Sequence, residues 1–366
     1  MSNRIGDLIT FTLFGESHGA EIGVVAEGLP HGIPVDTDAI DRQLSRRRPS
    51  GAISTARRET DPYRIVSGVF GGYTTGAPIC LTISNGDTKS KDYEELSYRP
   101  RPGHADYVSL VKYGGYGDYR GGGHFSGRLT APLTAMGALV GSALESRGIR
   151  IGAHIYSVGD IKDTPFTPTD HQLAAAGEGF PTIDKAAGER MEQYMKDAAA
   201  EGDSVGGVIE IAVTGVPAGV GEPWFDGVES AMARALFGIP AVKGVEFGAG
   251  FGICGMKGSE ANDPFYKDGE GRVLTKSNNN GGINGGITNG MPIIIRIAVK
   301  PTPSVFKEQK TLNLRTGEVE SLSIKGRHDP AIIHRAVPVA ESVAAMVMAD
   351  LLAKRYGPLW LKGEDK

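Results

Sequence analysis

The sequence predicts an α+β protein in which one large domain, residues 1–366, contains two pseudo-symmetric halves, about residues 1–150 and 200–357. Three observations predict this class. Stretches of β-branched residues bounded by glycine turns recur in the same order in both halves. Each half then ends in a long apolar helical pattern. No proline- or serine-rich linker separates the halves, so we do not expect two freely moving domains.

The repeated stretches are recognisable in the sequence itself. Residues 23–34 read GVVAEGLPHGIP and residues 208–221 read VIEIAVTGVPAGVG. Residues 71–83 read GGYTTGAPICLTI and residues 285–297 read GGITNGMPIIIRI. Short runs of Val and Ile between glycine turns indicate hairpins rather than βαβ crossovers. Two copies are too few for a solenoid, so the repeats predict one compact domain.

The helices follow from apolar spacing and end signals. Residues 128–148 and 335–357 carry apolar side chains at i, i+3, i+4 and i+7 and end at a glycine, so each closes one half. Asp36 or Thr37 is placed to cap a helix that runs to about Arg47. Two further helices and one long polar surface loop are expected at residues 184–200, 226–237 and 256–284.

Composition excludes several classes of protein. The chain is 40% apolar and 22% charged, as in an ordinary globular protein. We find no apolar run that approaches the roughly 20 residues of a spanning helix, and no signal peptide. With only Cys80 and Cys254 there is no disulfide framework. We therefore expect a cytoplasmic protein with no membrane partner, and a net charge of −4 gives no global field for nucleic acid.

Positive charge is nevertheless concentrated in one segment. Seven arginines lie between Arg42 and Arg64 against two acids, Glu59 and Asp61. Because the guanidinium fork matches phosphate and carboxylate groups, this block indicates an anion site. A solvated face or a subunit contact is the alternative, and composition alone does not separate them.

Two familiar motifs are present in form only. Residues 15–19 read GESHG and match the G-x-S-x-G elbow of serine hydrolases, but that elbow requires a following helix, whereas β-type sequence follows at 22–26. Residues 250–255 match G-x-G-x-x-G but lead into a loop, where no helix dipole would meet a phosphate. No His/Cys pair has the spacing of zinc ligands, so no metal is expected.

Four further motifs carry polar groups. His104, in RPGHAD, is a candidate acid or base on a turn, or a turn histidine that bonds backbone. Residues 121–128, GGGHFSGR, lead into a long helix and form an anion site or a flexible loop. KPTPS at 300–304 offers a lysine and two hydroxyls. The RHDP cluster at 327–330 is a site or a surface turn, because its charges are costly to bury unpaired.

Taken together, the motifs resemble the chorismate synthase family. In order along essentially the whole chain they are FGESHG, RRRP, RPGHAD, DYRGGG, the G-x-x-S-G-R-x-T of residues 123–130, EGDSVGG, GVPAGVGEP, AVKGVE, GGINGGI, KPT and GRHDP. The resemblance implies a β-α-β sandwich assembled as a homotetramer. It implies the last step of the shikimate pathway, in which phosphate and a ring proton leave 5-enolpyruvylshikimate 3-phosphate by anti-1,4-elimination to give chorismate. The reaction requires reduced FMN.

The resemblance also implies roles for individual residues. His18, beside Ser17, would be the general acid at the leaving phosphate, His104 would help set the ionisation of the flavin, and Asp329 would assist proton removal towards flavin N5. The substrate anions would be clamped by Ser17, Arg46, Arg47, Arg48, Arg101, Arg128 and Arg327. FMN would be held by His124, Phe125, Ser126, Pro240, Ala241, Gly286, Lys300, Pro301, Thr302, Pro303, Ser304 and Arg327.

Some positions depart from the common family pattern. His124 and Phe125 stand where many members have arginine and serine, so we expect them to contact FMN through backbone atoms only. Pro240 replaces a common asparagine and removes an amide side chain. Ile53 stands where members linked to nicotinamide nucleotide (NADP) are often basic, so we expect an external flavin reductant.

Two other functions remain open at this point. One is a non-catalytic phosphometabolite- or flavin-binding protein of the same fold, in which the changes at 124 and 125 abolished turnover. The other is a serine hydrolase that uses Ser17.

Overall fold

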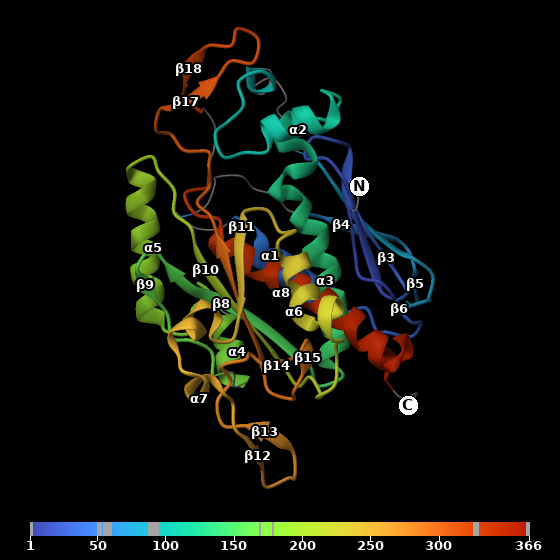
Figure 1. Ribbon diagram of the computed structural model, residues 1–366. Helices are drawn as coiled ribbons and strands as arrows, with labels where there is room; N and C mark the ends of the chain where they lie inside the picture. The colour runs from blue at the N-terminus through green and yellow to red at the C-terminus, as the bar shows by residue number, and fades with distance from the viewer. Residues whose placement is uncertain are drawn as a thin grey trace.

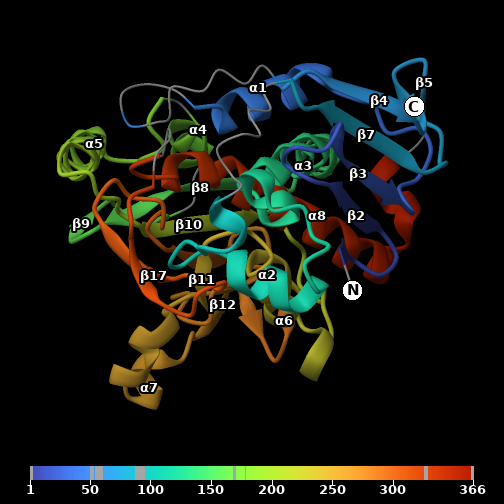
Figure 2. The same ribbon diagram turned by 90° about the horizontal axis from the view of Figure 1, so that it is seen from above.

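The computed structural model describes residues 3–49, 53, 61–86, 95–167, 170–177, 179–324 and 329–363. Two antiparallel five-stranded sheets enclose a layer of helices (Figure 1). Most of the buried apolar side chains form one continuous core. Seen from above, α3 and α8 lie between the two sheets (Figure 2). The β-α-β sandwich expected from the sequence is therefore confirmed.

The strands of the two sheets come from different parts of the chain. The first sheet has the order β1-β2-β3-β7-β4, formed by Arg4–Ile5, Thr10–Gly15, Glu21–Glu27, Ile79–Ser84 and Tyr63–Ser67. The second has the order β11-β16-β10-β8-β9, formed by Val242–Phe247, Ile293–Val299, Gly207–Thr214, Arg150–Val158 and Ile161–Lys162.

The two sheets share a pairing order. The series β2-β3-β7-β4 corresponds to β8-β10-β16-β11, with antiparallel pairs throughout. The repeated stretches noted in the sequence fall on β3 with β10 and on β7 with β16. This correspondence supports our proposal of two pseudo-symmetric halves. Because β8 is the counterpart of β2, we propose that the second half begins at Arg150 rather than near residue 200.

The inner helices pack closely on one another. They are α1 (Thr37–Arg47), α3 (Thr130–Glu145), α6 (Val228–Leu236) and α8 (Ile333–Tyr356), and α3 crosses α8 at the centre. Gly137 permits this crossing, because a Cβ there would lie 2.2 Å from the Cβ of Ser342. Asp36 caps α1 by accepting a hydrogen bond from the Ala39 N–H at 2.9 Å. The start of α1 therefore agrees with the capping signal in the sequence, whereas α3 ends at Glu145, before the glycine expected to stop it.

Helix α8 is long and apolar enough to cross a membrane by length and composition, with a window of mean hydropathy 1.6. This corrects the expectation that no apolar run in the chain approaches the length of a spanning helix. However, 94% of that window is buried inside the protein, and a core helix passes the same test. α8 is thus the central helix of the sandwich.

Further elements decorate the sandwich. The outer face of the second sheet carries α4 (Asp170–Ala176) and α5 (Lys185–Ala200). The long loop expected at 256–284 instead contains α7 (Gly258–Ala261) and a projecting hairpin, β12 (Phe265–Lys267) with β13 (Val273–Thr275) (Figure 1). The other short elements are β5 (Val69–Phe70), β6 (Tyr73–Thr74), η2 (Glu95–Ser97), α2 (Asp106–Tyr113), η5 (Trp224–Asp226), η6 (Gly250–Gly255), β14 (Ile283–Asn284), β15 (Ile287–Thr288), β17 (Gln309–Leu312), β18 (Val319–Leu322) and η7 (Pro358–Lys362).

Candidate active site

The GESHG motif forms the tight turn between β2 and β3. Because a strand rather than a helix follows it, the motif is not a hydrolase nucleophile elbow. Ser17 and His18 lie on this turn and are both buried. The two side chains are therefore held within the protein, at one end of the first sheet.

A run of three glycines covers this turn. Gly121, Gly122 and Gly123 have φ angles of 58°, 85° and 55° and form a non-helical kink within the segment η3 (Arg120–Phe125). A Cβ on Gly121 would lie 2.3 Å from Cε1 of His18 and 2.8 Å from Oγ of Ser17. The Ser17 N–H donates to the Gly123 carbonyl at 3.0 Å. Glycine is thus required here both by backbone conformation and by the contact with the histidine ring.

The residues after the glycines hold the loop in place. His124 Nδ1 donates to the Gly15 carbonyl at 2.7 Å, because a carbonyl oxygen only accepts. The imidazole therefore ties the loop to the β2–β3 turn. The half-exposed Phe125 ring lies against Tyr113. Ser126 Oγ caps the next turn by accepting from the Arg128 N–H at 3.3 Å.

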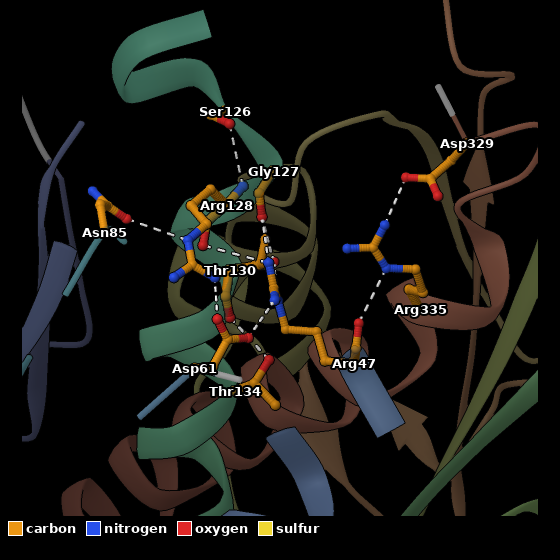
Figure 3. Close-up of polar contacts among 10 residues, drawn as sticks. All are labelled: Arg47, Asp61, Asn85, Ser126, Gly127, Arg128, Thr130, Thr134, Asp329 and Arg335. Atoms are coloured by element: carbon orange, nitrogen blue, oxygen red, sulfur yellow. Dashed lines mark hydrogen bonds and ion pairs between the residues drawn. The ribbon is translucent and has the colours of Figure 1, made fainter. Parts of the chain in front are cut away.

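Arg47 and Arg128 converge on one carboxylate, that of Asp61 (Figure 3). Arg47 Nη1 lies 3.1 Å from Asp61 Oδ2, and Arg128 Nη1 bonds the other oxygen, Oδ1. The side chain of Asp61 is fully buried and that of Arg47 is 3% exposed. Asp61 was not among the predicted site residues.

A second ion pair lies next to this cluster. Arg335, near the start of α8, donates to Asp329 Oδ2 at 2.6 Å and to the Arg47 carbonyl at 3.1 Å (Figure 3). Asp329 is thereby tied to the end of α1. Arg327 lies outside the described residues.

His104 and the KPTPS segment form a second group. His104 Nε2 shares a hydrogen bond with Ser304 Oγ at 2.7 Å, and Lys300 Nζ donates to the Gly103 carbonyl at 2.6 Å. The Lys300 N–H donates to the carbonyl of Ala241 at 2.9 Å, and Ala241 has a φ of 74°. Sequence motifs that lie about 200 residues apart are therefore in direct contact.

The EGDSVGG motif, residues 201–207, contacts both the KPTPS segment and the residue that follows Asp329. Ser204 Oγ donates to the Thr302 carbonyl at 2.7 Å, and the Val205 N–H donates to the Pro330 carbonyl at 2.9 Å. Because Pro330 follows Asp329, this segment connects the KPTPS turn to the Asp329–Arg335 pair. The sequence offered the motif but not this linking role.

Three other predicted arginines have their own contacts. Arg46 forms a bidentate pair with Glu341 on α8, at 2.5 and 2.9 Å. It lines a cavity of about 430 Å³ that includes no other predicted site residue. Arg101 pairs with Asp106 at 2.8 Å through two nitrogens, and Arg48 forms the C-cap of α1. Burial raises the pKa of Asp106, but Arg101 outweighs it and holds that pKa below its usual value.

Gly286 lies apart from the group around Lys300. It occupies the turn between β14 and β15, where its carbonyl accepts from the Val228 N–H at 2.9 Å. Strand β16 separates the two places, and its seven residues span roughly 20 Å. Within one chain, therefore, Gly286 does not line the same site as Lys300. Pro240 precedes Ala241 and is exposed.

The residues around Lys300 fit a cofactor that carries phosphate and other polar groups. Lys300 supplies an ammonium group, and Thr302 and Ser304 supply hydroxyls. In the part of the chain that the structure describes, the buried Oγ1 of Thr302 has no hydrogen-bond partner. A buried hydroxyl of this kind is normally satisfied, which fits a ligand rich in polar atoms. The described residues contain no group of His, Cys, Asp or Glu side chains that could hold a metal ion.

Comparison with known proteins supports one family. The sequence matches the family model described as Chorismate synthase over residues 9–353. The chorismate synthases of Thermococcus gammatolerans and Pyrococcus abyssi are each 48% identical over 350 residues, 96% of this chain and 97% of theirs. A solved structure, described as the crystal structure of chorismate synthase, superposes with a TM-score of 0.74 at 30% identity. It covers 96% of this chain and 94% of that chain.

These matches over nearly the full length, together with the shared sandwich, first define the class: the protein is an enzyme, a lyase. More particularly, the chain belongs to the chorismate synthase family. Membership makes it a lyase of aromatic amino-acid biosynthesis that forms chorismate in the shikimate pathway.

Proposed function

We propose that the chain forms chorismate from 5-enolpyruvylshikimate 3-phosphate by anti-1,4-elimination, and that reduced FMN is its cofactor. The observation that carries this proposal is the joining of two groups of residues. The group of Ser17, His18 and Arg128 suits the phosphate, and the group of His104 and residues 300–304 suits the flavin. When bound, reduced FMN would supply electron density to the elimination and would end the cycle in the same redox state.

His18 is the proposed general acid at the leaving phosphate. It is buried against Gly121, next to Ser17, so its ring has a fixed position. A positioned acid lowers the barrier by neutralising charge that develops on the leaving oxygen. Ser17 orients that oxygen through its hydroxyl, and the backbone N–H of Ser17 is already committed to Gly123.

Asp329 is proposed to assist removal of the ring proton towards the flavin. Its carboxylate is held in position by Arg335 at 2.6 Å. We propose that Arg128 binds the phosphate of the substrate together with Arg48 and Arg327. These are three of the six arginines for which the family resemblance implies contact with the substrate anions. Desolvated guanidinium groups in fixed positions stabilise such charge strongly.

FMN is proposed to be held by Lys300, Thr302 and Ser304, with His104 adjusting the ionisation of the ring system. The hydrogen bond between His104 and Ser304 supports this placement. We propose an external reductant, because Ile53 has a buried, apolar side chain at the position where NADP-linked members are often basic. The predicted contacts of His124, Phe125, Ser126, Pro240, Ala241, Gly286, Pro301 and Pro303 with FMN remain proposals.

We further propose a cytoplasmic homotetramer. None of the eight described residues of α2 is buried, although it carries Val108, Leu110 and Val111. Trp224 and Phe251 are also about 85% exposed. Exposed apolar surface of this extent is typical of subunit contacts. The gap between Gly286 and Lys300 within one chain is consistent with a cofactor site completed by a second copy. Light scattering during size-exclusion chromatography tests the tetramer.

One anaerobic experiment separates the candidate functions. The protein is mixed with FMN, dithionite and 5-enolpyruvylshikimate 3-phosphate, and chorismate and phosphate are both followed. Formation of both products only with reduced FMN is expected. Flavin binding without product would favour the non-catalytic binding protein. Phosphate release that needs Ser17 but not flavin would favour the hydrolase.

A further inference from the structure

We propose that Asp61 is a positioning residue that fixes the guanidinium of Arg128 at the phosphate site. We also propose that Arg47 belongs to the buried frame around Asp61 and does not contact the ligand. The inference deepens the proposed function and rests on it, because it assigns Arg128 to the phosphate of the substrate.

Asp61 lies in a buried environment, where a carboxylate needs ion pairs or hydrogen bonds to offset its desolvation. Its side chain is fully buried, and each of its two oxygens bonds a different arginine (Figure 3). Its φ of 46° lies in the left-handed region, which non-glycine residues rarely adopt. Such strain persists only where the surroundings fix it, and it is common at functional sites.

Arg47 directs its fork into the protein. Nε donates to Thr130 Oγ1 at 2.9 Å, Nη1 to Asp61, and Nη2 to the carbonyls of Gly127 at 3.1 Å and Arg128 at 3.4 Å. Three of these four contacts, those to Thr130, Gly127 and Arg128, hold the first turn of α3 and the backbone of Arg128. The side chain is 3% exposed, so a ligand has little access to it.

Arg128 is fixed on three sides. Asp61 holds Nη1, the Ser126 hydroxyl holds its backbone N–H, and Nε donates to Asn85 Oδ1 at 3.3 Å. Asn85 Nδ2 in turn donates to the carbonyls of Glu16 and Gly19 at 3.0 and 2.9 Å. These two residues flank Ser17 and His18 in the β2–β3 turn. Asp61 and Asn85 therefore set Arg128 relative to the proposed acid.

The direction in which Asp61→Asn changes anion affinity distinguishes a positioning role of Asp61 from a purely electrostatic one. Replacing Asp61 by asparagine removes a negative charge, so a purely electrostatic role predicts tighter binding of an anion. A positioning role predicts weaker binding, because a guanidinium that has lost its carboxylate samples more orientations. The two accounts therefore predict opposite changes for the same variant.

The test compares Asp61→Asn with wild type in the anaerobic assay and, separately, in equilibrium dialysis with inorganic phosphate. We expect KM and the phosphate Kd to rise about tenfold or more, with a smaller change in kcat, and Asp61→Glu to recover part of the affinity. Unchanged or tighter binding by folded Asp61→Asn would overturn the proposal. If wild type forms no chorismate, the proposed function fails, whereas phosphate dialysis still tests the role of Asp61.

A second comparison keeps the test decisive if Asp61→Asn does not fold. Arg47→Met leaves the Asp61–Arg128 pair, and the double variant Arg47→Met/Asp61→Asn removes both buried partners together. We expect near-normal KM in the first and a rise of about tenfold in the second. An equal rise in both would overturn the assignment of Arg47 to the frame.

Thr130→Val is the matched control. It removes the hydroxyl that bonds Arg47 and leaves the Asp61–Arg128 pair in place. We expect lower stability with unchanged KM. A rise in KM as large as that of Asp61→Asn would mean that any disturbance of the frame suffices, and would contradict a specific role of Asp61.

Discussion

At the scale of single residues, the proposed chemistry depends first on His18. Replacing it by glutamine keeps the volume of the side chain but removes the acid, so kcat should fall by about 10² to 10⁴ while KM changes little. Turnover in the anaerobic assay measures this. His31→Gln is the control, because His31 is exposed and lies outside the predicted site. A His18→Gln enzyme with normal kcat would remove the general-acid role.

His334, near the start of α8, predicts a pH dependence of stability. Burial, together with the charge of Arg335, lowers the pKa of His334 from 6.5 to about 4. The unfolded chain therefore binds a proton below about pH 6.5 that the folded protein resists until about pH 4. In this window the free energy of unfolding should fall as the pH falls, by up to about 3 kcal/mol.

Denaturant unfolding of wild type and His334→Asn at about pH 7 and about pH 4.5 measures this effect. Asparagine does not titrate, so the variant should lose less stability than wild type between the two values. Equal losses in both proteins would show that His334 does not account for the pH dependence.

At the scale of elements, the glycine loop η3 is the part that holds the acid. Gly121→Ala should displace the His18 ring, because the new Cβ would lie 2.3 Å from Cε1 and the φ of 58° disfavours alanine. Since a misplacement of about 1 Å costs about 10²-fold in rate, kcat should fall by that order. Gly127→Ala is the matched control a few residues on, where a Cβ meets no atom within 4 Å. Equal kcat in the two variants would contradict the packing argument.

The same scale separates the arginines of the basic block from one another. Arg46 and Arg47 are neighbours on α1, so their side chains point in different directions around the helix. Arg46 meets Glu341 on α8, whereas Arg47 meets Asp61 and α3. The sequence indicated an anion site from the number of arginines, but it could not show which of them were already paired. The signal for Asp61 was present, since it is one of two acids among seven arginines.

At the scale of the whole molecule, the repeats in the sequence predicted the architecture well. Short β-branched runs and glycine turns predicted the antiparallel strands, and the repeated order agrees with the matching strand order of the two sheets. The sequence did not predict that β8 precedes the second set of repeats. The corresponding strand of the first sheet, β2, shares no sequence motif with β8. It also missed the β12–β13 hairpin, whose polar, glycine-rich residues read as loop.

Most of the features that the sequence did not predict are contacts between residues far apart in the chain. The pairing of His104 with Ser304 spans 200 positions, and the link from Ser204 to Thr302 spans 98. Such contacts follow from the way the sheets bring chain segments together, which no local pattern encodes. The family resemblance supplied the residues on both sides, and the fold explains why those residues meet. Gly286 is the exception, because within one chain it lies apart from the residues around Lys300.

The central claim is that one site removes phosphate and a ring proton together, and only with reduced flavin present. The most direct measurement is the ratio of chorismate formed to phosphate released under anaerobic conditions, with reduced and with oxidised FMN. We expect a ratio of about one with reduced FMN and neither product with oxidised FMN. Phosphate released without chorismate, or turnover that does not depend on the flavin, would contradict it.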